Sequence, residues 1–419
     1  MSGGRNRRKE TGPFSPFEVT SLLESPAPRN RLRNLTLLFA SSLTVMAGTP
    51  VAPALPSMAA AFEHESSSDL KVRLMLTMPG LFIGLLAPAS GWLVDRLGRK
   101  PLLLWGTVLY AIAGSSGLYL NSLWTILIGR AFLGIAVAAV MTAAVTLIGD
   151  YFTHAARHRF IGLQTAFMSF GGIFFLLGGG VLSDWSWRGP FAVYLAALLV
   201  IPMILVSIDE PARDSAAARQ ADGLMPTTAP WGVVALIYMV AFFGMIAFYA
   251  IPIQIPFHLR SLFKADGTYV GIAIATMTLF ATIASLLYSR IKAHLSFAAV
   301  VAGMLLGMGI GFLLVAQATS YTGVLVGLVV AGLGIGLLMP NLNVWLMGIA
   351  PEASRGRLVG GLTMALFLGQ FFSPIFLAPL LASEGTAGVF KALATGSLAS
   401  MAVFAIYAAY EAFARKQAT

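Results

Sequence analysis

Residues 91–104 read GWLVDRLGRKPLLL and place four charged side chains between two long apolar runs. The runs cover residues 73–94 and 101–120, and each contains the roughly 20 residues that a helix needs to cross a hydrocarbon core. A short, mostly basic segment between two such runs is typical of a loop that joins two membrane-spanning helices. The stretch therefore predicts a helical hairpin in a membrane, with residues 95–100 at the membrane surface.

The composition of the whole chain excludes a soluble protein. Of the 419 residues, 58% are hydrophobic and 11% are charged, and the mean hydropathy is +0.82, whereas soluble domains carry about 25% charged residues. Apolar runs long enough to span occur at 34–56, 73–94, 101–120, 123–149, 159–182, 189–208, 231–256, 269–289, 297–317, 322–349, 358–382 and 387–411. We expect an all-α membrane protein with 12 transmembrane helices.

The distribution of Lys and Arg predicts the orientation. If the N-terminus is cytoplasmic, 20 of the 27 basic residues lie on the cytoplasmic side and six on the other side, with Arg130 inside a span. An excess of this kind marks the cytoplasmic loops. Both termini are therefore expected in the cytoplasm of a multi-pass protein of the cytoplasmic (inner) membrane. The basic run at residues 5–9 then reads as a solvated tail that sets topology, and nucleic acid is not expected as a partner.

An internal repeat divides the chain into two halves. Five residues recur at an offset of 198 positions: Arg157, Arg159, Gly162, Thr165 and Gly171 return as Arg355, Arg357, Gly360, Thr363 and Gly369. Parallel repeats of this kind are typical of one large class of secondary transporters. The expected domains are a cytoplasmic basic tail (1–32), two pseudo-symmetric six-helix bundles (33–208 and 231–411), a cytoplasmic linker (209–230) and a cytoplasmic tail (412–419).

The loop at 91–104 resembles the signature G-x-L-x-D-R-x-G-R-K-x-x-L of the major facilitator superfamily. Residues 130–134 (RAFLG) are similar to that family's R-x-x-x-G segment, and Trp187 and Arg188 follow the fifth span as its W-R-x-x-F does. The chain resembles the 12-span drug and metabolite exporter branch, although Phe175 and Leu176 replace the Gly-Pro of that branch's fifth span.

The resemblance implies a set of residues that control the conformational cycle. It implies that Asp95 meets the N-terminal end of the eleventh span and that Arg99 pairs with Asp150 at the end of the fourth. The alternative is a basic turn that only sets topology. The residues assigned to gating are Gly91, Asp95, Arg96, Gly98, Arg99, Lys100 and Asp150.

Arg130 is a charged residue in the middle of a predicted span. A guanidinium in hydrocarbon must face the bundle interior or water. The resemblance implies a role in coupling or in shaping the cavity, and a structural arginine that bonds backbone carbonyls is the alternative.

Uncharged polar side chains within the spans are the candidate substrate ligands. Such groups are unfavourable against lipid unless they bond one another, water or a ligand. Bonds between helices that only hold the fold together are the alternative role. The candidates, with one aromatic wall residue, are Gln164, Tyr249, Gln254, Asn341, Asn343, Gln370 and Trp345.

These features favour an alternating-access secondary transporter that exports a small amphipathic molecule, with proton coupling left open. The alternatives are an importer of an organic anion held by Arg130, and a receptor or scaffold that does not transport. The chain has no cysteine, no HExxH, no P-loop and no GxSxG motif, so we expect no enzyme activity, no metal and no cofactor. The expected partners are a small-molecule substrate and membrane lipid, and the expected state is a monomer.

Overall fold

The computed structural model describes residues 28–87, 90–211, 229–351 and 354–418, and in these ranges the chain is helical with no strand. The first helices are α2 (Pro28–Met46), η1 (Thr49–Ala54), α3 (Leu55–Ala61), α4 (Ser68–Leu86), α5 (Ser90–Leu97), α6 (Arg99–Gly114), η2 (Ser115–Leu118), α7 (Leu123–Tyr151), α8 (His154–Trp185), η3 (Gly189–Ala196) and α9 (Ala197–Ser207). They are followed by α10 (Trp231–Phe263), α11 (Gly267–Lys292), α12 (Phe297–Gln317), α13 (Tyr321–Ile335), α14 (Leu338–Ile349) and α15 (Arg355–Ala418).

Ten helical segments among the described residues are long and apolar enough to cross a membrane. The predicted second span is divided between α4 and α5, on either side of positions 88–89, and is not among the ten. The last two predicted spans both lie in α15, which contains a non-helical residue, Gly385, at φ 66° and ψ −171°. The membrane fold is therefore as expected, while the number of 12 spans stays a prediction.

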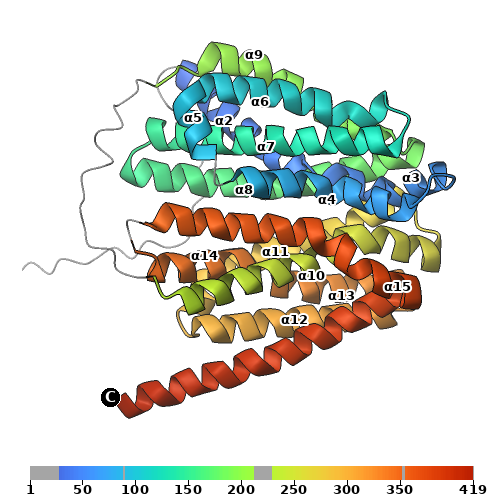
Figure 1. Cartoon of the computed structure of the whole chain (residues 1–419), viewed down its shortest axis with the longest axis vertical. Coiled ribbons are helices and arrows are strands. Elements are labelled where there is room, and N and C mark those ends of the chain that lie inside the picture. The colour runs from blue at the N-terminus through green and yellow to red at the C-terminus, as the bar shows by residue number, and fades with distance from the viewer. Residues whose placement is uncertain (1–27, 88–89, 212–228, 352–353, 419) are drawn as a thin grey trace, which may run out of the picture.

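The helices form two groups (Figure 1). Helices α2–α9 lie together on one side of the molecule and α10–α15 on the other. Two of the buried apolar clusters lie within the α2–α9 group, and the largest lies mostly within α10–α15 but includes Ala52, Leu76 and Leu176 of the first group. We refer to residues 28–211 as the N-terminal half and to residues 229–418 as the C-terminal half. The predicted tail at 1–27 and most of the linker lie outside the described residues, so the domain boundaries stay predictions.

The helix ends define two faces of the molecule, which we name by position. The linker end carries the start of α6, the end of α9 and the start of α10, and lies on the left of Figure 1. The far end carries α3 and the junction between α10 and α11, and lies on the right.

Glycines bring the two halves into close contact. A Cβ added at Gly80 of α4 would lie 2.9 Å from Cδ of Gln370 in α15. A Cβ at Gly180 of α8 would lie 2.7 Å from the carbonyl oxygen of Gly267 at the start of α11. Small residues allow helices to approach at backbone distance in a membrane. The α4–α15 and α8–α11 pairs therefore form the interface that positions the candidate site.

Candidate functional site

The signature loop ends α5 at Gly98, where the chain turns into α6. Gly98 has φ +89° and ψ 160°, a conformation that is essentially restricted to glycine. The carboxylate of Glu210 accepts the backbone N–H groups of Arg99 at 2.8 Å and of Lys100 at 2.7 Å. A carboxylate at a helix N-terminus pairs with unsatisfied N–H groups and with the positive end of the helix dipole. Glu210, which follows the last helix of the N-terminal half, thus caps α6.

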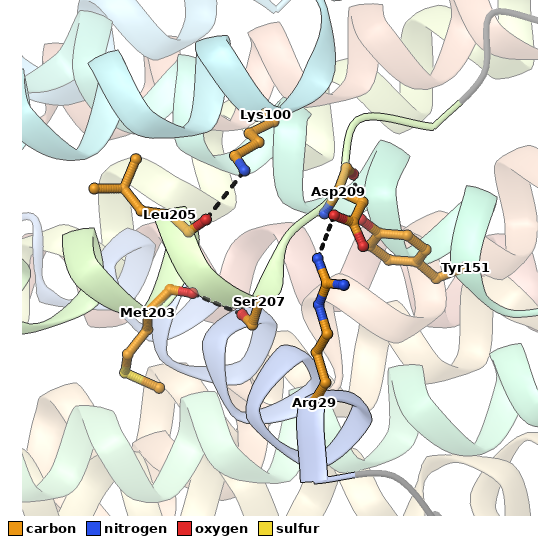
Figure 2. Close-up of polar contacts among 7 residues, drawn as sticks. All are labelled: Arg29, Lys100, Tyr151, Met203, Leu205, Ser207 and Asp209. Carbon is orange, nitrogen blue, oxygen red and sulfur yellow. Dashed lines mark hydrogen bonds and ion pairs between the residues drawn. The ribbon is translucent and has the colours of Figure 1, made fainter.

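The Arg99 side chain makes the contact that the family resemblance implies. Its Nε donates to Oδ2 of Asp150 at 3.1 Å, and Arg99 is 8% exposed. Lys100 extends its Nζ to the carbonyl oxygen of Leu205 at 3.2 Å, as Figure 2 shows. Both contacts stay within the N-terminal half, and their role in gating stays a prediction.

Three further residues assigned to gating lie in α5. Arg96 is exposed. The side chain of Asp95 and the contacts of Gly91 lie outside the described part of the chain. The contact of Asp95 with the eleventh span therefore stays a prediction.

Asp209 is tied to two other helix ends (Figure 2). Arg29, at the start of α2, pairs with its carboxylate at 2.5 Å. The hydroxyl of Tyr151, at the end of α7, donates to the Asp209 carbonyl at 2.5 Å and accepts the Asp209 N–H at 3.0 Å. Asp209 and Glu210 therefore fix the start of the linker to the N-terminal half. The sequence places both in the predicted linker at 209–230, and their position directly after the apolar run 189–208 is the signal that could have set them apart.

Arg130 is fully buried inside the N-terminal half. Its Nη1 donates to the Tyr194 hydroxyl at 2.8 Å and to the Ala47 carbonyl at 3.4 Å, and its guanidinium lies 4.7 Å from the centre of the Phe191 ring. The side chain is 0% exposed. It faces the interior, as the cost of a charge in lipid requires, but these contacts separate it from the interface between the halves.

Arg73, in the first half of α4, lies at that interface. Its Nη1 donates to Oε1 of Gln254 and to the Ile253 carbonyl at 3.4 Å, and its guanidinium stands 3.9 Å from the centre of the Phe257 ring. All three partners belong to α10 in the C-terminal half. The side chain is 5% exposed. The sequence analysis had counted Arg73 only among the loop charges.

A line of buried polar groups continues from Arg73 along the interface. Arg73, Thr77, Gly80 and Gly84 follow one another at helical spacing and share one face of α4. Gly80 faces Gln370, which is 5% exposed, and Thr77 and Gln254 are both 0% exposed. Four side-chain atoms of this group make no hydrogen bond within the described residues: Nε of Arg73, Oγ1 of Thr77, Nε2 of Gln254 and Oε1 of Gln370. Buried polar atoms without partners are rare in native proteins. Others occur within one half, among them Nε and Nη2 of Arg130, but these four lie on residues at the interface between the halves, so this group is the candidate binding site.

Further hydrogen bonds between the halves lie at the far end. Asp184, at the end of α8, accepts the Gly267 N–H at 2.6 Å and the Thr268 N–H at 3.2 Å at the start of α11. Arg260 of α10 donates to the Ser57 hydroxyl of α3 at 2.8 Å. The halves are thus joined at the far end.

Helix α8 has a different environment towards the linker end. None of the residues 161–171 is buried, although they complete three turns and point in all directions around the helix. Towards the far end, Leu176, Gly179, Gly180 and Ser183 of the same helix are buried. The side of α8 that faces α11 is therefore covered near the far end and uncovered near the linker end.

A sequence profile of the Major Facilitator Superfamily matches residues 37–260 and 236–418, which together include both halves. The chain belongs to the Major Facilitator Superfamily. Its sequence identity to individual proteins is modest. It is 24% identical to the quinolone resistance protein NorA of Staphylococcus aureus, over 76% of this chain and 82% of NorA.

Other superfamily members resemble shorter parts of the chain or only its fold. It is 28% identical to the probable vesicular acetylcholine transporter-B of Danio rerio, over 47% of this chain but only 41% of that protein. The structure matches the inward-open xylose transporter XylE of E. coli with a TM-score of 0.71 at 15% identity, covering 88% of this chain and 94% of XylE. At this identity the match concerns the fold alone.

The other predicted ligands of the chain lie away from the line of polar groups that begins at Arg73. Gln164 donates to the Ser41 hydroxyl at 2.8 Å, inside the N-terminal half. Asn341 accepts from the Tyr288 hydroxyl at 3.2 Å and donates to the Phe297 carbonyl at 3.2 Å.

The remaining three predicted ligands are aromatic or amide side chains of the C-terminal half. Asn343 is exposed and bonds the carbonyl of Met339 in its own helix. The Trp345 ring stacks on Phe297 at 5.5 Å, and Tyr249 is half-buried beside Phe248. The structure thus places Gln254 against Arg73 and Gln370 against Gly80 of the same helix face, and the ligand roles of all seven residues stay predictions.

Proposed function

We propose that the protein is an alternating-access secondary transporter with its central path open at the linker end. The far-end contacts of Asp184 and Arg260 support a closed far end, and the uncovered stretch 161–171 of α8 supports an open linker end. Transport by this mechanism requires a site that each side reaches in turn, at the interface between halves that rock against each other.

We further propose 12 spans, both termini in the cytoplasm, and residence in the cytoplasmic membrane. Helices α4 and α5 together form the second span, and α15 supplies two spans on either side of Gly385. The excess of Lys and Arg at the linker end supports a cytoplasmic position for this end. The path then opens towards the cytoplasm.

The observation that carries this function is the line of buried polar groups at the interface. Arg73, Thr77, Gln254 and Gln370 each hold an unpaired polar atom between the halves, and a ligand bound there would satisfy these atoms. Apolar side chains such as Phe257 surround the polar ones, which suits an amphipathic molecule. We propose export of a small amphipathic molecule, driven by an ion gradient of which the proton gradient is the first to test.

The two alternatives, an importer of an organic anion and a receptor or scaffold, require different properties of the molecule. An importer that holds an organic anion on Arg130 requires access to a side chain whose hydrogen bonds lie within one half, whereas those of Arg73 join the two halves, so the interface fits better than Arg130 does. A receptor or scaffold requires no flux.

Flux across reconstituted vesicles tests the proposal. The protein is inserted into three sets of liposomes. Each set contains one membrane-impermeant fluorescent probe, which is anionic, neutral or cationic. A proton gradient is imposed in one direction and then in the other. We expect protein-dependent movement of at least one probe that responds to the direction of the gradient. Movement no faster than in protein-free vesicles for all three probes, in both directions, contradicts transport and favours the receptor reading.

A further inference from the structure

Arg73 carries a positive charge that forms no direct ion pair among the described residues, although Asp69 acts on it electrostatically. Asp69 precedes it by one helical turn on α4, but its side chain is exposed at the far end, whereas Arg73 is 5% exposed. A buried charge without an opposite charge paired to it is unfavourable. The burial of Arg73 therefore suggests a role other than stabilising the fold.

The partners of Arg73 all lie in the opposite half. Oε1 of Gln254, the Ile253 carbonyl and the Phe257 ring belong to α10, whereas Arg73 belongs to α4. When the halves separate at the far end, the guanidinium loses all three contacts at once. It is then a cation in a narrow slot between apolar helices, and an anion is the partner that compensates it best.

The groups around Arg73 are donors or neutral groups. Nε of Arg73 and Nε2 of Gln254 are both unpaired donors. The Gln370 amide can present its NH₂ group after a flip, because amide orientation is assigned from hydrogen bonding, and Thr77 has a hydroxyl that can donate. Gln254 contacts Arg73, whereas Gln370 lies against Gly80, two helical turns further along α4. The two unpaired donors, Nε of Arg73 and Nε2 of Gln254, suit the oxygen atoms of an anion, and the two unpaired oxygen atoms, Oγ1 of Thr77 and Oε1 of Gln370, carry no negative charge.

An open surface hollow adjoins Phe257, the residue whose ring contacts Arg73. It measures 520 Å³ and is lined by Phe257, Arg260, Ser261, Ser68, Asp69 and Glu63, among others. Phe257 therefore contacts Arg73 and also lines the hollow. The two carboxylates in this lining, of Asp69 and Glu63, outnumber its one guanidinium, of Arg260, which disfavours the return of a released anion and agrees with export.

We propose that the transported molecule carries an anionic oxygen group, namely a carboxylate, sulfonate or phosphate ester, and that Arg73 binds this group together with Gln254. The inference rests on the proposed function, because it assigns the substrate class of the same interface. It moves the anion-binding role from Arg130, where the sequence analysis had placed it in one alternative, to Arg73.

Three impermeant fluorescent probes test the charge preference in reconstituted vesicles: carboxyfluorescein as the anion, 4-methylumbelliferyl glucoside as the neutral compound and ethidium as the cation. We expect the wild-type protein to move carboxyfluorescein at least tenfold faster than ethidium. Arg73→Gln should reduce carboxyfluorescein flux at least tenfold, and Arg73→Lys should retain more flux than Arg73→Gln. Gln254→Glu should also reduce it at least tenfold, because the new carboxylate pairs with Arg73 in place of the anion.

Lys264→Gln is the matched control, since it removes an exposed positive charge from the same end of the molecule. We expect its flux to stay within twofold of the wild-type value. Each variant is compared at equal inserted amounts, after size-exclusion chromatography and thermal unfolding in detergent have established that it folds.

The possible outcomes separate this inference from the proposed function. Preferential flux of ethidium or the neutral probe supports a transporter and overturns the anionic substrate. The same holds if Arg73→Gln slows all probes equally, since Arg73 then only closes the far end. If no probe moves, the proposed function fails and the inference fails with it.

Discussion

A Cβ added at Gly98 would lie 2.9 Å from Oε1 of Glu210, so the turn of the signature loop and the first residues of the linker occupy adjoining space. Gly98 thereby serves two purposes: it supplies the backbone conformation that ends α5, and it leaves room for the carboxylate that caps α6. This relationship links the loop between the second and third predicted spans to the segment that joins the two halves.

Gly98→Ala should lower the free energy of unfolding by about 1–3 kcal/mol, the cost of a side chain in this region of φ and ψ, with the contact to Glu210 adding to it. Thermal unfolding in detergent measures the effect. Gly303→Ala is the control, because Gly303 lies within α12 with nothing within 4 Å of an added Cβ. In a helix interior the same change stabilises by about 0.5–1 kcal/mol. Equal effects of both substitutions would rule out the special role of Gly98.

Glu210→Ala should lower stability by about 0.5–2 kcal/mol, the range for loss of a helix N-cap. Glu210→Gln should cost less, because its amide oxygen still accepts one of the N–H groups of Arg99 and Lys100. The difference should shrink at high salt, since part of it comes from the negative charge near the helix N-terminus. Glu63→Gln, at an exposed far-end position, is the control. Stability that is unchanged in Glu210→Ala would show that the cap contributes nothing.

Arg130→Ala should destabilise the protein by about 2–5 kcal/mol, as large-to-small changes in a packed core do, without changing the affinity for a transported probe more than twofold. Tyr194→Phe should cost about 1–3 kcal/mol, because it removes the hydroxyl that bonds both Arg130 and the Ala47 carbonyl. Unfolding and probe binding are measured on the same samples. A tenfold loss of affinity with unchanged stability would return Arg130 to the substrate site.

Ser169→Cys and Ser183→Cys test which end is open, since the chain has no other cysteine. Both positions lie near the side of α8 that carries Leu176 and Gly180 and faces α11. Ser183 is 8% exposed, whereas Ser169 lies in the uncovered stretch 161–171. A membrane-impermeant maleimide should label position 169 at least tenfold faster than position 183. Labelling of 169 from the side that holds the termini would also support the proposed orientation. Faster labelling at 183 would mean that the protein rests with its far end open.

The sequence predicted those parts of the molecule that follow from local pattern. Helical membrane segments follow from hydropathy alone, and the Arg99–Asp150 contact followed from the resemblance of residues 91–104 to a family signature. Gln254 and Gln370 were singled out because amides in apolar helices need partners, and the structure places both at the interface.

The rest depends on how the halves meet, which hydropathy does not specify. Arg73 lies near the start of an apolar run, where a charge is ordinary, and only the packing of α4 against α10 makes it a buried cation. Glu210 caps a helix that begins 111 residues earlier in the chain, and no local pattern predicts a contact of that range. Asn341 fitted the same description as Gln254, yet its partners lie within one half. Polarity thus identifies residues that need partners, but not whether the partner is protein or ligand.

The tight turn at Gly385 limits where the far end can be modified for experiments. Gly385 is a single non-helical residue between two helical parts of α15, so an epitope tag, a protease site or a fluorophore inserted there would have no loop to occupy. Residues 63, 64, 66 and 67, in the connection between α3 and α4, are exposed and outside any helix. An insertion in that connection is therefore the better handle for antibody detection or surface immobilisation from the far end.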